Sequence, residues 1–283
     1  MRRYKRIKNK KSRELRIKKI RGFIYLFLIL LILIIAFVLI KITSLKKFIY
    51  VNNVDSNAEI TVVDPQKLKI IKILIPENTQ INSSRGFGVY KISSLWKLGE
   101  KEGLKGKLVT ESVRRDFLIP LYLWKDGDKT NLNFWQRIKI YLLDKGFSNY
   151  YVNNINLIDN RVLKLKKFTD GTDGYIISSK IPESILINFV EDYMTETVSK
   201  IEIEDLTGNS MTVENISKIL GVMGGKIISY SKGFDKDFDC EVIGKDKILV
   251  GVVSKNFDCK VSIDTKLSVD LKIRLGGRFV DRF

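Results

Sequence analysis

The chain has 283 residues, two cysteines, no histidine and a formal net charge of +18. The lack of histidine excludes Ser-His and Cys-His nucleophile pairs and removes the commonest zinc ligand. Most of the charge belongs to residues 1–50, because residues 51–283 carry thirty-five basic groups against thirty-one acidic ones. A nucleic-acid-binding domain carries its basic excess on the folded part, so this balance argues against a nucleic-acid partner.

Residues 23–40 form an uncharged apolar run. As a helix this run is about 27 Å long, close to the hydrocarbon thickness of a bilayer. Residues 1–22 contain twelve Lys and Arg, and basic residues beside a span are held in the cytoplasm. We expect a cytoplasmic tail at 1–22, a transmembrane helix at 23–40 and the bulk of the chain outside the cell membrane. A cleaved signal peptide is the alternative, but no small-residue cleavage motif ends the run.

The remaining chain has the pattern of an α/β protein. Residues 41–54 are expected to be a connector and 55–197 one α/β domain. We expect its elements, in chain order, to be a hairpin turning at Asp64-Pro65, a glycine-containing loop at 83–88, helices at 91–102 and 107–117, a buried strand at 119–124, a helix at 133–145, strands at 161–168 and 174–179, and a helix from Pro182 to about Thr197.

The segment 133–145 has the clearest helical pattern. Asn133 is the expected N-cap and Gly146 the expected stop. The spacing of its apolar residues predicts a core-facing stripe formed by Phe134, Ile138, Tyr141 and Leu142.

Residues 198–283 are expected to form a second, smaller domain of two β-α-β units. Its cysteines lie in a repeated tripeptide, Phe238-Asp-Cys240 and Phe257-Asp-Cys259. Each tripeptide begins an expected strand, and the two strands flank one crossover helix. Such strands can lie close enough for a disulfide, so we predict a structural Cys240–Cys259 bond. Two buried free thiols are the alternative.

Several short segments resemble the LytR-CpsA-Psr family of cell-envelope proteins. The segments Thr61–Pro65, Ile73–Thr79 and Lys91-Ile92 are similar to the early part of the family domain, with its Ile-Pro-Arg-Asp-Thr motif. The region from Ile201 to Phe279 resembles the LytR C-terminal domain. The resemblance implies transfer of anionic glycopolymer from a polyprenyl-pyrophosphate carrier to the cell wall. It also implies arginines and a carboxylate-held divalent cation at the pyrophosphate.

This chain departs from the family motif at its reactive positions. Where the family has Pro-Arg-Asp, it has Pro76-Glu77-Asn78, which replaces a cation by an acid and a carboxylate by an amide. We therefore expect a non-catalytic binding or scaffolding protein in cell-wall glycopolymer assembly, without a catalytic residue, metal or cofactor. The alternative is a divergent phosphotransferase, which would use Mg²⁺. Expected partners are the lipid bilayer, wall glycopolymer or a polyprenyl-phosphate lipid, or another envelope protein.

Arg85 and Lys91 are the candidate phosphate-binding residues, because they flank a glycine loop that could approach a phosphate. Arg114 and Arg115 lie beside Asp116 in an expected helix, and this pattern is typical of a solvated face. Asp126 and Asp128, and the segment 170–174, have the composition of turns rather than cation sites. The three tryptophans lie in apolar stretches and are expected to pack in the core.

Overall fold

The computed structural model describes residues 27–38, 40–41, 44–146, 149–196 and 199–283. The chain divides into two compact units, one formed by residues 1–45 with 133–148 and the other by 46–132 with 149–283. The expected cytoplasmic tail at 1–22 lies outside the described residues. The expected domains 55–197 and 198–283 contribute largely to the same second unit, so the boundary between them stays a prediction.

The described part of the first unit holds an N-terminal helical segment and helix α4 (Phe134–Asp144). Residues 27–38 and 40–41 are helical, and large apolar side chains are exposed from Phe27 to Ile40. Within the described ranges, no helix combines the length and the apolar character that crossing a membrane requires. The span expected at 23–40 begins outside these ranges and stays a prediction.

Helix α4 begins and ends as expected. The side chain of Asn133 accepts a hydrogen bond from the Gln136 amide at 2.9 Å, and the Gln136 side chain accepts one from the Asn133 amide at 2.9 Å. This reciprocal pair is a capping box. Gly146 follows the helix with a φ of 72°, as a C-terminal stop requires.

The inward stripe predicted for α4 is wrong. Phe134 is 63% exposed and Tyr141 is 60% exposed. The helix is rotated so that a different stripe is buried, formed by Gln136, Lys139 and Ile140.

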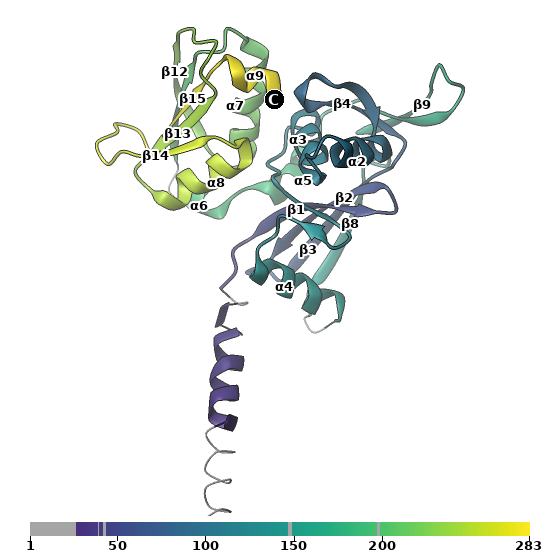
Figure 1. Cartoon of the computed structure of the whole chain (residues 1–283), viewed down its shortest axis with the longest axis vertical. Coiled ribbons are helices and arrows are strands. Elements are labelled where there is room, and N and C mark those ends of the chain that lie inside the picture. Colours follow the sequence, from purple (N-terminus) through teal and green to yellow (C-terminus); the bar gives the residue numbers. More distant parts are fainter. Residues whose placement is uncertain (1–26, 39, 42–43, 147–148, 197–198) are drawn as a thin grey trace, which may run out of the picture. The chain divides into compact units, whose positions relative to one another are not determined.

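The second unit opens with a six-stranded sheet in the order β7-β6-β1-β2-β3-β8 (Figure 1). Its strands are β1 (Phe48–Val54), β2 (Asn57–Asp64), β3 (Lys69–Ile75), β6 (Leu123–Asp126), β7 (Lys129–Thr130) and β8 (Tyr151–Asn156). Strands β2 and β3 are antiparallel, with Asp64 opposite Lys69. The hairpin predicted at Asp64-Pro65 is therefore confirmed, and the Asp64 carboxylate closes the turn by accepting from the amides of Gln66 and Lys67.

Strand β1 lies inside the segment expected to be a connector, so that prediction is wrong for residues 48–54. It pairs antiparallel with β2 and parallel with β6. The run from Phe48 to Val51 is buried. These apolar side chains form a strand because pairing on both edges satisfies their backbone and removes them from water.

A second sheet has four strands in the order β5-β4-β10-β9. Its strands are β4 (Thr79–Ser83), β5 (Gly88–Lys91), β9 (Leu163–Lys167) and β10 (Asp173–Ile177). The glycine-containing loop between β4 and β5 holds one 3-10 turn, η1 (Ser84–Gly86). The strands expected at 161–168 and 174–179 correspond to β9 and β10.

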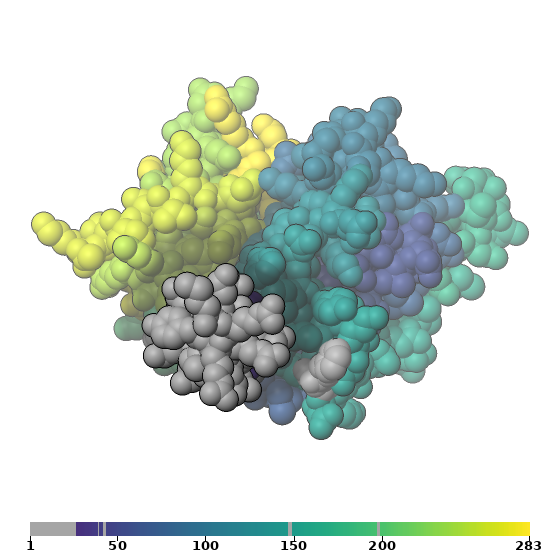
Figure 2. Space-filling view, turned by 60° about the horizontal axis from the view of Figure 1, so that its bottom comes forward, coloured from purple at the N-terminus to yellow at the C-terminus, as the bar shows by residue number. Residues whose placement is uncertain are grey.

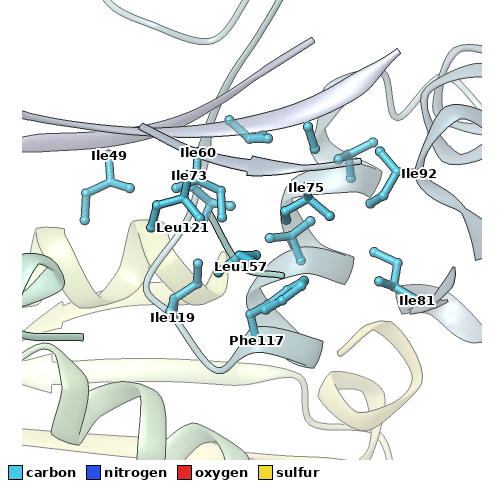
Figure 3. Close-up of a cluster of buried hydrophobic side chains, with 14 of the residues drawn as sticks. Ile49, Ile60, Ile73, Ile75, Ile81, Ile92, Phe117, Ile119, Leu121 and Leu157 are labelled. Atoms are coloured by element: carbon cyan, nitrogen blue, oxygen red, sulfur yellow. The ribbon is translucent and has the colours of Figure 1, made fainter. Parts of the chain in front are cut away.

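Helices α2 (Ile92–Lys101) and α3 (Gly106–Phe117) contribute to one hydrophobic core with the strands. In Figure 3, Ile60 of β2 and Ile73 of β3 extend from the sheet toward Phe117 and Ile119. Trp96 and Trp124 are buried in the same core, as expected for two of the three tryptophans.

The segment expected to be a single helix from Pro182 is broken. It forms α5 (Glu183–Leu186), η2 (Ile187–Phe189) and α6 (Asp192–Glu196). Val190 interrupts the helix with an extended ψ of 130°. The following amide, of Glu191, donates to the carbonyl oxygen of Met223 at 3.0 Å, and this long-range bond replaces the helical one.

The C-terminal residues build a five-stranded sheet in the order β12-β11-β15-β13-β14. The elements are β11 (Lys200–Asp205), α7 (Ser210–Val222), β12 (Lys226–Lys232), β13 (Cys240–Gly244), α8 (Lys247–Phe257), β14 (Lys260–Ile263), β15 (Leu271–Leu275) and α9 (Gly277–Arg282). Strands β11 and β12 are parallel and flank α7, and strands β13 and β14 are parallel and flank α8. These are the two expected β-α-β units. Strand β15 lies between the two units. In the space-filling view these residues, green to yellow, gather into one body (Figure 2).

Candidate functional site

Arg85 lies in η1 and has a φ of 63°. Its guanidinium binds Glu111 of α3 at two points, with Nε 2.8 Å from Oε2 and Nη2 2.9 Å from Oε1. Glu111 is only 3% exposed. The hydrogen bonds to Glu111 raise the pKa of Arg85, and partial burial opposes this rise. A buried carboxylate therefore already balances the charge that was expected to meet a phosphate.

Lys91 ends β5 and is the N-cap of α2. Its Nζ donates to Thr172 Oγ1 at 2.9 Å and to Asp170 Oδ2 at 3.4 Å, and lies 5.3 Å from the centre of the Phe168 ring. The pKa of Asp170 is lowered, chiefly by hydrogen bonds from Thr172. Arg85 and Lys91 thus bind different carboxylates on different elements, and the phosphate contact expected of them stays a prediction.

The segment that takes the place of the family motif joins strands together. The Glu77 amide donates to Asn57 Oδ1 at 2.8 Å, between β2 and the end of β3. Asn78 Nδ2 donates to the carbonyl oxygen of Asp173 at 3.1 Å, and the Asn78 carbonyl accepts from the Tyr175 amide at 3.2 Å. These contacts attach β10 beside β4.

The divalent cation that the resemblance implies does not fit these residues. The Asn78 side chain is an amide, and its nitrogen is bound to the Asp173 carbonyl. Among the described residues, no group of three His, Cys, Asp or Glu could hold a metal ion. Asp170 instead closes its own turn by accepting from the Thr172 amide at 2.9 Å. We derive no chemical step through a metal at this position.

The solvated face predicted for Arg114 is wrong. Arg114 is 3% exposed, and its Nη1 donates to the carbonyl oxygens of Leu121 and Asn256. Its guanidinium lies 5.7 Å and 5.8 Å from the ring centres of Phe257 and Phe283. Burial lowers the pKa of Arg114 to about 10, an effect that the charge of Glu111 opposes and that of Arg282 increases.

Arg115 and Asp116, at the end of α3, also form hydrogen bonds with other parts of the chain. Arg115 donates to the backbone oxygens of Ser83 at 3.0 Å and Phe283 at 3.2 Å. The Asp116 carboxylate accepts from the backbone amide of Asn82 at 2.6 Å and from its side chain at 3.1 Å. Burial raises the pKa of Asp116, against the opposing effect of the Asn82 bonds. The solvated face predicted for Arg114 and Arg115 is wrong because α3 packs between β4 and the C-terminal residues.

Two cavities meet beside this end of α3, and Asp116, Leu118 and Ile177 line both. The first, which we call the apolar cavity, has a volume of about 870 Å³. Apolar side chains form most of its wall, among them Phe117, Leu186, Ile187, Val190 and Val222. The second, which we call the amide groove, has a volume of about 810 Å³.

The amide groove is named for four carboxamide side chains in its wall, Gln80, Asn82, Asn209 and Asn215. Each carboxamide presents two N–H donors and a carbonyl acceptor. The side chains of Gln80 and Asn215 form no hydrogen bond with any residue that the structure describes, so their full capacity is open to a ligand. A groove of this size with a few convergent polar groups has the character of a small-molecule or polymer site.

No local sequence signal marks the amide groove. Its residues come from β4 (Gln80, Asn82), from the N-cap of α7 (Asn209) and from α7 itself (Asn215). They meet only because α3 packs against both parts of the chain. Single Asn and Gln residues at such distances cannot be told from ordinary surface residues in a sequence.

The predicted disulfide is confirmed. Cys240 and Cys259 are bonded, with their Cα atoms 5.0 Å apart. Cys240 opens β13, and Cys259 directly precedes β14, its parallel neighbour in the sheet. Arg282 of α9 donates to Cys240 Sγ at 3.0 Å and to the carbonyl oxygen of Phe257 at 2.9 Å. The bond therefore closes one β-α-β unit and has a structural role.

No family model, no curated protein and no solved structure matches this chain.

Proposed function

We propose that this chain is a membrane-anchored, extracytoplasmic cell-envelope protein of LytR-CpsA-Psr type. In this role it binds cell-wall glycopolymer, or positions it during assembly, without transferring it. The proposal combines the short motifs at 61–65, 73–79 and 201–279 with the contacts around α3. One observation carries the non-catalytic part, namely that Nε and Nη2 of Arg85 both donate to the buried Glu111, at 2.8 and 2.9 Å.

Electrostatics explain why this ion pair argues against transfer. Phosphoryl transfer relies on fixed positive charge at the phosphoryl oxygens, and a cation already neutralised at short range offers little of it. Freeing Arg85 would leave the buried Glu111 with the more distant Lys107, 3.9 Å away, as its cation, which is unfavourable. Pro76-Glu77-Asn78 also has an acid where the family motif has a cation.

The amide groove supports the binding part of the proposal. Sugars present many hydroxyl groups, and carboxamides can donate to them and accept from them. The adjoining apolar cavity can take the less polar face of a ring or a linked apolar group. Lys180, exposed in the wall of the apolar cavity, supplies a positive charge that suits an anionic polymer, whereas Arg115 and Lys218 are balanced by Asp116 and Glu214.

Three further features support the location. The helical segment 27–38 exposes large apolar side chains, as a helix that is immersed in lipid does. The Cys240–Cys259 bond is typical of proteins outside the reducing cytoplasm. The basic residues at 1–22 favour a cytoplasmic N-terminus.

Binding of purified wall glycopolymer to the full chain in lipid nanodiscs tests the proposal. We expect saturable binding that weakens about tenfold when Gln80→Ala and Asn215→Ala remove two groove contacts of about 0.7 kcal/mol each. Gln66→Ala is the matched control, because Gln66 is an exposed residue in the turn after β2. Glycopolymer that binds the groove variant and the wild type equally would refute the proposed site.

The phosphotransferase alternative makes a different prediction in the same preparation. It requires stoichiometric polyprenyl phosphate or pyrophosphate among the lipids that co-purify with the chain. Glu77→Arg would then increase carrier binding by restoring the family cation. Transfer of glycopolymer by the wild-type chain would overturn the non-catalytic proposal directly.

A further inference from the structure

Helix α4 exposes to solvent the apolar stripe that the sequence predicted to face the core. Phe134 and Tyr141, two turns apart, are 63% and 60% exposed, and Ile138 lies half-buried between them. Arg137 and Lys145 are exposed on the same side, and Lys145 Nζ lies 5.9 Å from the centre of the Tyr141 ring. An exposed stripe of aromatic and aliphatic residues beside cations is unusual for a helix in water.

The buried stripe of α4 makes this arrangement more unusual. Gln136 and Lys139 are buried, although the same helix has larger apolar side chains that could have been buried instead. The Gln136 side chain is hydrogen-bonded in the capping box, so the unfavourable part of this arrangement in water is the exposure of the aromatic side chains. That exposure becomes favourable when the stripe meets an apolar medium.

The aromatic residues of α4 contact the N-terminal helical segment of the same unit. The Trp135 ring lies edge-on to Phe37, with centroids 6.0 Å apart, and edge-on to Phe134 at 5.2 Å. Lys41 Nζ lies 5.7 Å from the centre of the Phe37 ring. The exposed stripe of α4 is therefore continuous with the exposed apolar side chains that run from Phe27 to Ile40.

We propose that α4 lies in the headgroup layer of the bilayer, with Phe134, Trp135 and Tyr141 at the boundary between headgroups and acyl chains. The inference rests on the proposed function, because it takes residues 23–40 as the membrane anchor. Tryptophan and tyrosine concentrate at this boundary, where an apolar ring and a polar group are both satisfied. Amphipathic helices with aromatic and basic residues bind there, parallel to the membrane plane.

The positive charge around the exposed stripe of α4 favours an anionic lipid surface as its binding partner. Arg137, Lys145 and Lys41 surround the aromatic residues, and Asp144 is the only acid in α4. Each Lys or Arg near an anionic surface contributes about 1 kcal/mol of attraction, which falls with salt. The contact fixes a second point of the chain at the membrane, roughly 100 residues after the anchor.

Quenching of Trp135 fluorescence tests this placement in the full chain. The protein is reconstituted in vesicles that contain phosphatidylglycerol and lipids brominated near the headgroup end of the acyl chain. Trp96 and Trp124 are buried in the core, so the quenched component is assigned by its disappearance in Trp135→Phe. We expect Trp135 to be quenched more strongly by these lipids than by lipids brominated near the bilayer centre.

Two sets of variants separate the aromatic and charge contributions. Phe134→Ser with Tyr141→Ser is expected to remove most of the quenching. Tyr230→Ser with Phe234→Ser is the matched control, since Tyr230 of β12 and Phe234 in the loop after it are 57% and 73% exposed and should not affect it. Arg137→Glu with Lys145→Glu is expected to reduce quenching in phosphatidylglycerol vesicles and not in purely zwitterionic ones.

The outcomes distinguish this inference from the proposed function. Extraction of the whole chain from the vesicles by alkaline carbonate would refute the anchor and with it the proposed function. A chain that is retained but whose Trp135 is not quenched would overturn the placement of α4 alone. Serine variants that instead dissociate a dimer, without any change in quenching, would identify the stripe as a protein contact and also overturn it.

Discussion

Lys107 Nζ on α3 lies 2.6 Å from Oδ2 of Asp258, the residue directly before the disulfide-bonded Cys259. This hydrogen bond lowers the pKa of Asp258. Three residues of α3 thus reach the C-terminal part of the chain, because Arg114 binds the Asn256 carbonyl and Arg115 the backbone of Phe283. The helix that forms part of the first core also holds the segment between α8 and β14.

Loss of the disulfide is expected to destabilise the second unit by about 3 kcal/mol, the value for a closed loop of this length. The bonded cysteines are nineteen residues apart. Urea unfolding of Cys240→Ser with Cys259→Ser measures the effect, and dithiothreitol should reproduce it in the wild type. The double variant is the control for the reductant, because its midpoint should not change. Equal midpoints for wild type and variant would contradict a stabilising role.

Arg85→Ala is expected to cost about 3 kcal/mol, because it leaves Glu111 buried without its guanidinium partner. Adding Glu111→Gln should recover much of this loss by removing a buried charge that only the 3.9 Å pair with Lys107 would still balance among the described residues. Lys91→Ala is the matched comparison and should cost less than about 1 kcal/mol, since its partner Asp170 is exposed. Chemical denaturation of the three variants checks the order, and similar losses for Arg85→Ala and Lys91→Ala would be inconsistent with it.

Glu191 is expected to make stability fall as the pH rises from about 4.5 to about 6. Burial raises the pKa of Glu191 from 4.5 to about 6, partly offset by Lys47 and Lys46 and increased by Asp192. A raised carboxyl pKa means that the folded state retains its proton longer. Its contribution is therefore present below pH 4.5 and is lost above about pH 6.

Glu191→Gln should remove this loss. We expect the variant to gain about 1–2 kcal/mol over the wild type between pH 4 and pH 7, because the pKa of Glu191 rises from 4.5 to about 6 on folding. Unfolding free energies of both proteins across this range measure the difference. Glu196→Gln, the same change at an exposed acid of α6, is the charge-matched control. A wild-type-to-variant difference that is constant with pH would refute the assignment to Glu191.

Three helical glycines should respond to alanine in opposite ways. A Cβ at Gly221 of α7 or Gly251 of α8 would meet no atom within 4 Å, so each change should stabilise by about 0.5–1 kcal/mol through helix propensity. A Cβ at Gly99 of α2 would lie 2.2 Å from the carbonyl oxygen of Lys105, so that change should destabilise. Thermal unfolding of the three single variants tests the signs, and a stabilising Gly99→Ala would contradict the close packing.

Local chemistry made two features predictable. The Asn133 cap and its reciprocal partner Gln136 are separated by three residues, so the capping box is visible in the sequence. The repeated Phe-Asp-Cys tripeptide placed two cysteines at equivalent points of one β-α-β unit, and the 5.0 Å between their Cα atoms agrees. Both signals depend on spacing within about twenty residues.

Features that depend on distant partners were not predictable. Strand β1 pairs with β6, which lies about seventy residues later in the chain. Its own apolar pattern is short and directly follows the long apolar segment, so the sequence does not separate the two. Arg114 looks solvated beside Arg115 and Asp116, yet its partner Asn256 lies 142 residues away. The amide groove also depends on distant partners. Gln80 and Asn215 line one groove only because α3 packs against both parts of the chain.

The position of β15 sets the order in which the C-terminal sheet can form. This strand is the last in the chain but lies at the centre, paired with β11 on one side and β13 on the other. Until residues 271–275 pair, β11–β12 and β13–β14 form two separate two-stranded ribbons, and such ribbons are marginal in water. The facing edges of β11 and β13 therefore stay open during folding until β15 joins both halves.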